Sequence, residues 1–110
     1  NTLGSMNNLA GTLGSQGDLT GARALQEKVL DAQHRLLGED HPDTLTSMNN
    51  LAHTLWQMNE YLPARQWMQS AAQGRVQVLG PAHPHTQSSV KAAEQMRAAL
   101  HSLGARDAPC

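Results

Sequence analysis

Few residues in this chain could take part in chemistry, and they are scattered. Six histidines invite a metal hypothesis. His83 and His85 are only two residues apart with no cysteine nearby, however, which is a weak spacing for a structural metal site. His41 and His83 each precede a proline, so we expect them to help start a helix. Glu39 and Asp40 are adjacent, in a linker where a helix N-terminus favours negative charge. We therefore predict no metal site and no cofactor.

Signatures of catalysis are also missing from the sequence. There is no phosphate-binding glycine loop, and no Ser/His/Asp or Cys/His set lies in a context that would form a nucleophilic site. Cys110 is the last residue, where little structure can activate a nucleophile. We expect a protein that is not an enzyme.

Two pairs of adjacent asparagines are the most unusual polar residues. Asn7–Asn8 and Asn49–Asn50 interrupt apolar runs, although asparagine is unfavourable in a helix interior. Around the second pair, apolar residues recur three and four apart, which predicts a helix. A carboxamide both donates and accepts hydrogen bonds, so these side chains could serve either a peptide backbone or a neighbouring helix.

The asparagine pairs recur because the chain repeats. Residues 1–42 and 43–84 are identical at 16 of 42 positions, against about two or three expected from average composition. The agreement is densest in TLGSMNNLAGTL and TLTSMNNLAHTL, and both units close with a related linker, LGEDHP and LGPAHP. The next residues, HTQSSV, begin a third copy. We expect the chain to be a fragment of a longer repeat array.

Each unit predicts two helices joined by a short turn. The expected helices cover about 2–15, 20–37, 44–58 and 63–79, followed by a last helix over 85–103 and a flexible tail over 104–110. Gly38 and Gly80 are expected as left-handed caps at helix C-termini. Helix hairpins repeated at a fixed period stack into a solenoid. The sequence therefore predicts an all-α protein without strands.

The apolar and small residues of the second unit carry a family resemblance. The positions concerned are Met48, Leu51, Ala52, Leu55, Tyr61, Ala64, Met68 and Ala71. With the small-residue pairs Ala10/Ala22 and Ala52/Ala64, they resemble the tetratricopeptide repeat. The 42-residue period, NNLA and LGEDHP resemble the kinesin light chain subtype in particular. HEAT and armadillo repeats have similar periods of about 40–47 residues, so period alone leaves them open.

The resemblance implies an α-solenoid of antiparallel helix hairpins. Its parts would be a first unit in 1–42, a second unit in 43–84 and a capping helix in 85–103. In the third copy Glu94 replaces the small alanine and Arg97 replaces a buried leucine. Charge at these close-packing positions suggests that no further helix covers the last one.

The resemblance also implies a peptide-binding groove on the concave face lined by the first helix of each unit. The candidate binding residues are Asn7, Thr46, Asn49, His53, Trp56, Lys91 and Gln95. We expect Asn49 to be exposed on this face and Asn50 to be mostly buried and paired, because adjacent helix residues are about 100° apart. Trp56 could be a peptide platform or could pack on a neighbouring helix. The alternative function is a structural or self-association spacer within a larger signalling protein, with no peptide ligand.

Composition narrows the partner class. The net charge is -1, which offers no electrostatic footprint for nucleic acid or anionic membrane. No apolar run approaches the roughly 20 residues of a membrane span. A single cysteine favours an intracellular, cytoplasmic protein. We expect a protein or peptide partner. A homodimer formed through the apolar edge of the first helix, at Leu3, Met6 and Leu13, is an alternative.

Overall fold

The computed structural model describes the backbone of residues 2–107 and the side chains of residues 9–102. Its helices are α1 (Thr2–Ser15), α2 (Leu19–Leu37), α3 (Pro42–Gln57), α4 (Tyr61–Leu79) and α5 (Pro84–Asp107). No strand occurs between residues 2 and 107. The predicted all-α architecture is confirmed.

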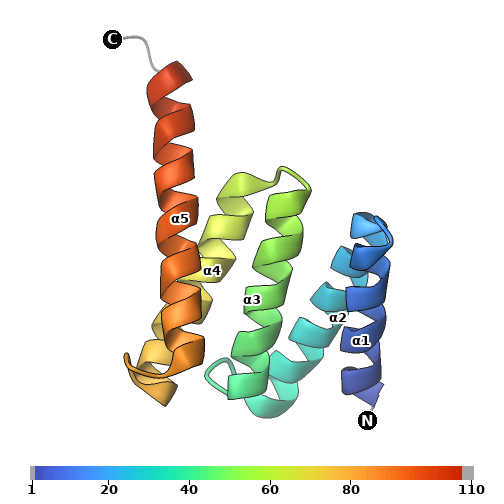
Figure 1. The fold of residues 1–110 in the computed structure, drawn as a ribbon. Coiled ribbons are helices and arrows are strands. Elements are labelled where there is room, and N and C mark those ends of the chain that lie inside the picture. The colour runs from blue at the N-terminus through green and yellow to red at the C-terminus, as the bar shows by residue number, and fades with distance from the viewer. Residues whose placement is uncertain (1, 108–110) are drawn as a thin grey trace.

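The helices form two layers. Each helix packs against the next one along the chain, and α2 lies behind α1 and α3 while α4 lies behind α3 and α5 (Figure 1). We call α1, α3 and α5 the front layer, and α2 and α4 the back layer. The molecule is elongated, with extents of 52 × 34 × 22 Å. Two helix hairpins followed by a single helix therefore make a short solenoid.

Side chains at the linkers start the helices as expected. The Asp18 carboxylate accepts a hydrogen bond from the Gly21 backbone N–H at 2.9 Å, at the beginning of α2. His41 Nδ1 accepts from the Asp43 N–H at 3.1 Å, and His83 Nδ1 accepts from the His85 N–H at 3.0 Å. These bonds satisfy backbone donors that have no partner within the first helical turn. The two linker histidines therefore cap helices at the same position of the repeat.

Two details of the helix ends differ from the sequence-based expectation. Gly38 and Gly80 have φ of 93° and 91°, as a glycine cap requires, but their ψ values of 161° and 156° lie outside the left-handed helical region. α5 continues to Asp107, so residues 104–107 are helical rather than part of a tail. Residues 108–110 lie outside the described part of the chain.

The core is centred on α3, which has helices on both sides. Leu45, Leu51 and Leu55 are 1–2% exposed, and Ala52 is fully buried. Close approach of α4 depends on small residues, because a Cβ added to Gly74 would lie 2.4 Å from Leu45 Cδ2. Burying these aliphatic side chains supplies most of the driving force for stacking.

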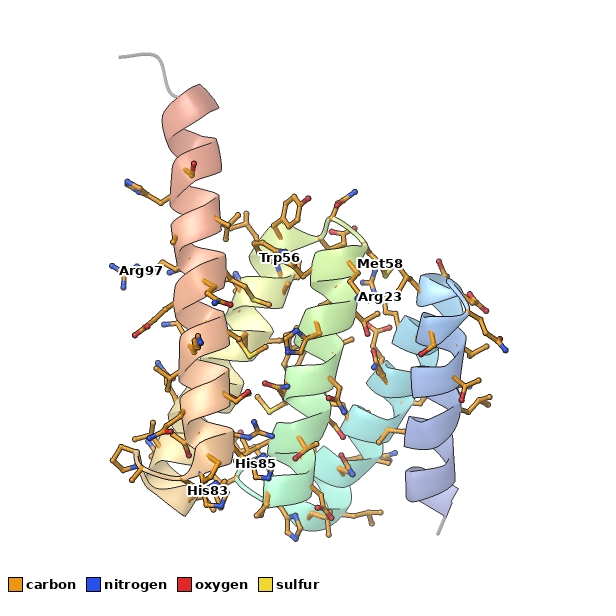
Figure 2. The ribbon with its side chains drawn as sticks, viewed as in Figure 1. Arg23, Trp56, Met58, His83, His85 and Arg97 are labelled. Atoms are coloured by element: carbon orange, nitrogen blue, oxygen red, sulfur yellow. The ribbon has the colours of Figure 1, made fainter. Side chains whose placement is uncertain are left out.

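The face of α5 that lacks a following helix is charged. Glu94 and Arg97 are both exposed, and Arg97 points away from the other helices in Figure 2. A charged side chain at a close-packing position would lose its hydration if another helix covered it. This desolvation cost disfavours the docking of a further helix there. That α5 ends the stack stays a prediction.

A polar contact links the two hairpins and recurs at the repeat period. Ser47 of α3 donates a hydrogen bond to Gln33 Oε1 of α2. Forty-two residues later in both helices, Arg75 Nη1 of α4 donates to Ser89 Oγ of α5 at 2.7 Å. All four residues are buried. The same pair of positions therefore joins each back-layer helix to the next front-layer helix.

Candidate protein-binding surface

The front layer contains a hollow of about 370 Å³ between α1 and α3. It is lined by Ala10, Gly11, Gly14 and Ser15 of α1, by Gln26 of α2, and by Asn50, His53, Thr54 and Gln57 of α3. Among the described side chains that line it, none is an acid, a lysine or an arginine. The hollow therefore offers amides, hydroxyls and an imidazole rather than fixed charge.

The wall that α1 contributes to this hollow includes two glycines, Gly11 and Gly14, with open space beside them. A Cβ added to Gly11 would meet nothing within 4 Å, and one added to Gly14 would meet only Ala22 Cβ at 3.9 Å. Glycines lower the stability of a helix interior. They also let another polypeptide backbone approach the helix closely. The glycines that weaken α1 thus leave one wall of the hollow open.

One residue that lines this hollow carries a buried acceptor without a partner. Gln26 is 7% exposed, and its Oε1 has no hydrogen-bond partner among the described residues. A buried polar atom without a partner is unfavourable by about 1–3 kcal/mol. A turn of the side chain toward the hollow would let Oε1 accept from a bound donor, such as a peptide N–H, and would relieve that penalty.

The imidazole of His53 keeps the hollow uncharged at neutral pH. Partial burial lowers the pKa of His53 below its ordinary value, because desolvation disfavours the charged ring. A neutral imidazole donates through one nitrogen and accepts through the other. This suits hydrogen bonding to uncharged groups better than binding to a carboxylate.

Asn49 and Thr46 take part in a partly buried hydrogen-bond network between helices. Asn49 is half-buried, and its Oδ1 accepts from Ser89 Oγ at 3.0 Å. Thr46 is exposed, and its Oγ1 accepts from Arg75 Nη2 at 3.2 Å. Arg75 Nη1 also donates to the His85 carbonyl at 3.1 Å. Together these groups join α3, α4 and α5.

Sequence reasoning missed Arg75, which is 5% exposed and bears the charge at the centre of this network. Burial lowers its pKa, yet a guanidinium stays protonated under all ordinary conditions. A signal was present in the sequence, because Arg75 lies on the side of its helix that carries Ala71 and Ala72 and is otherwise apolar. The structure shows that Gln33 and Arg75, 42 residues apart, both contact the next front-layer helix.

Of the two properties expected for Asn50, burial and pairing, the pairing is wrong. Its side chain is largely shielded from solvent and lines the hollow, but no hydrogen bond joins it to another side chain of residues 9–102. α3 has neighbours on both sides, and the rotation of about 100° per residue directs Asn49 toward α5 and Asn50 toward α1. The two amides therefore have separate environments, in the opposite sense to the one expected.

The remaining predicted binding residues are dispersed over the front layer. Trp56 is half-buried, packs against the core, and meets the Tyr61 ring edge-on with centroids 4.6 Å apart, near the turn between α3 and α4 (Figure 2). It is therefore at least partly a packing residue. Lys91 and Gln95 are exposed on α5. The side chain of Asn7 lies outside the described residues.

No group of three or more His, Cys, Asp or Glu side chains in the described part of the chain could hold a metal ion. The His83 and His85 rings stack with centroids 5.1 Å apart, which is a ring contact rather than a ligand set. None of the helices between residues 2 and 107 combines the length and apolarity needed to cross a membrane.

Comparison with known proteins shows which family and which solved structure this architecture resembles. The tetratricopeptide repeat family model matches residues 1–77. No curated protein sequence matches the chain. Among solved structures, the chain is similar to the nearly identical TPR-like repeats assigned to a kinesin light chain of Podosopora anserina, with a TM-score of 0.75 and 21% identity, over 97% of this chain and 57% of that one.

The chain thus spans a little over half of that structure, and the likeness concerns the fold. Repeats of this family generally mediate protein–protein interaction and are typically scaffolds without catalytic activity. The period, the hairpins and the matching family model agree, and the chain belongs to the tetratricopeptide repeat family, with a fold of the kinesin light chain type.

Proposed function

We propose that the front layer binds an extended segment of a partner protein. The observation that carries this proposal is the hollow between α1 and α3, whose lining includes Gln26 with its buried, unpartnered Oε1. The proposed contact residues are those expected from the sequence, Asn7, Thr46, Asn49, His53, Trp56, Lys91 and Gln95, together with Gln26, Asn50 and Gln57 from the hollow. A cytoplasmic location stays a prediction.

The contacts would be made mainly to the backbone of the bound segment. Gln26 accepts a peptide N–H, while Asn50 and Gln57 can each donate to a carbonyl and accept from an N–H. Gly11 lets the bound backbone lie close to α1. Asn49 already accepts from Ser89, which leaves its amide nitrogen to donate to the segment. Lys91 adds one positive charge at the α5 end.

Blocking the hollow tests this function. Gly11→Leu places a side chain in space that is open within 4 Å of the new Cβ, so it should fill the hollow without disturbing the fold. Ala24→Leu, on the exposed side of α2, is the matched control because it adds similar bulk elsewhere. Peptides are first selected on the wild-type protein from a displayed library and then measured by titration calorimetry.

We expect Gly11→Leu to weaken binding of a selected peptide by about tenfold or more, which corresponds to about 1.4 kcal/mol. Ala24→Leu should leave the affinity within about twofold. Selected peptides that bind both variants like the wild type would contradict the assignment of the hollow. So would a library that yields no binder.

A second candidate function, self-association, is favoured by Leu9. This side chain of α1 is 50% exposed, whereas Leu51 at the same repeat position is 1% exposed. An exposed leucine at a position built for burial is a surface that another helix could cover. We propose a homodimer through this edge of α1 as the alternative to a peptide ligand. The other residues expected at that edge, Leu3 and Met6, have side chains outside the described part, and Leu13 is half-buried.

A further inference from the structure

A second and larger hollow lies on the back layer, between α2 and α4. Its volume is about 640 Å³. Its floor consists of the core side chains Leu30, Leu45, Met48 and Leu51, and Trp67 forms part of the α4 wall. Leu30 and Met48 are 6% and 8% exposed, and Trp67 is half-buried. We call this hollow the back groove.

The rim of the back groove is acidic. Glu27 and Asp31 of α2 and Glu39 and Asp40 of the following linker line it, and none of its lining residues is a lysine or an arginine. The whole chain has a net charge of only -1. Four carboxylates around one hollow are therefore a local concentration of charge, not a reflection of overall composition.

Existing ion pairs only partly neutralise this rim. Arg23 lies 3.5 Å from Glu27, Arg35 lies 3.3 Å from Asp31, and His34 Nε2 lies 3.5 Å from Glu39 Oε2. All three pairs are exposed, and the two arginine pairs join residues four apart on one helix, which makes them weak and easily exchanged. The carboxylates therefore remain available to cations on a partner.

The second unit shows that the fold does not need these carboxylates. Forty-two residues after Glu27, Asp31, Glu39 and Asp40 stand Gln69, Gln73, Pro81 and Ala82, all uncharged. Gln69 and Gln73 line the equivalent hollow between α4 and α5, which is smaller, about 180 Å³, and whose charged lining residues are Arg65, Glu94 and Arg97. The acidic rim is thus a property of the first unit alone, added to a shared scaffold.

We infer that the back groove docks a basic amphipathic segment of a partner protein. Its apolar side chains would lie over Met48 and Trp67, and its Lys or Arg side chains would meet the carboxylates of Glu27 and Asp31. The small exposed apolar area makes charge the main source of specificity and of the association rate. This surface lies on the opposite layer from the hollow that contains Gln26, so both could be occupied together.

A charge-reversible probe tests the inference. The probe is a synthetic helix-forming peptide of about 14 residues, about 21 Å long, with leucines on one face and lysines on the other. Two further peptides replace every lysine by glutamate, or every leucine by serine. Binding to the full chain is measured by titration calorimetry at roughly 0.15 M salt, where long-range charge effects are screened.

Glu27→Gln/Asp31→Gln installs the amide type that the second unit carries at both positions. The matched control, Glu60→Gln/Glu94→Gln, makes the same change of net charge at exposed residues outside the back groove. We expect the groove variant to weaken binding of the Leu/Lys peptide by about tenfold or more. The control should change it by less than about twofold, and the glutamate and serine peptides should not bind.

Three results would overturn the inference. One is a wild-type protein that does not bind the Leu/Lys peptide, and another is an equal loss of affinity in the control variant. The third comes from sedimentation: a dimer that dissociates in Glu27→Gln/Asp31→Gln would assign the back groove to a second copy of this chain instead of a foreign partner.

Discussion

The adjacent asparagines of α3 give the sharpest prediction. Asn49 Oδ1 accepts a hydrogen bond from Ser89 Oγ at 3.0 Å, and Ser89 is fully buried. Asn50 lines the hollow between α1 and α3 instead. Asn49→Ala should therefore destabilise the protein, whereas Asn50→Ala should not.

The magnitude follows from what each substitution leaves behind. Asn49→Ala deprives the buried Ser89 hydroxyl of its acceptor, at a cost of about 1–3 kcal/mol. Both substitutions gain helix propensity, by about 0.5 kcal/mol each, so that term cancels when the two variants are compared. Asn49→Ala should thus be about 1–3 kcal/mol less stable than Asn50→Ala.

Thermal melts followed by circular dichroism measure this difference. At roughly 4 °C per kcal/mol for a chain of this size, the midpoints should differ by about 4–12 °C. A double-mutant cycle with Ser89→Ala tests the partner, because Asn49→Ala should cost little once Ser89 cannot donate. The reasoning is refuted if Asn50→Ala is as damaging as Asn49→Ala, or if the two substitutions at 49 and 89 are additive.

Three further predictions concern packing, association and pH. Gly74→Ala should destabilise the protein by about 1–3 kcal/mol in urea titration, because its Cβ would lie 2.4 Å from Leu45 Cδ2; Gly11→Ala, with nothing within 4 Å, should stabilise it by about 0.5–1 kcal/mol, and the reverse order would contradict the packing. If α1 mediates self-association, a dimer seen by sedimentation at high protein concentration should be lost in Leu9→Gln, and a wild-type protein that stays monomeric would count against it. Because burial lowers the pKa of His53 in the folded state, the unfolded chain takes up the proton first as pH falls. The free energy of unfolding therefore has its full value above pH about 6.5, where His53 is neutral in both states, and declines as the pH falls from there through the pKa of the folded state. His53→Gln should flatten that decline in urea titrations from pH 7.5 to about 5, and an unchanged slope would show that His53 is not its source.

Helix positions and core residues could be predicted because they depend on local and periodic information. The pattern of Leu51, Ala52 and Leu55 repeats every three or four residues, and each of these side chains is buried. The His-Pro linkers and the glycines after Leu37 and Leu79 mark the helix ends. Most observed helix ends lie within about two residues of their predicted positions. Repetition at 42 residues then implied stacking, since a hairpin with an apolar side needs a neighbour to cover it.

The binding surfaces were only partly predictable, because they depend on which helix faces which. Sequence alone showed that Asn49 and Asn50 could not point the same way, but only the packing of α3 between α1 and α5 decided which one met Ser89. The sequence shows that Arg75 carries a charge. Only its position beside α5 shows that this side chain is buried and joins α4 to α5. The acidic rim around Glu27 likewise needed α4 to become the wall of a hollow. Helix propensity and period are properties of one segment, whereas a hydrogen bond or a groove requires side chains from two or three helices at a distance that only their packing sets.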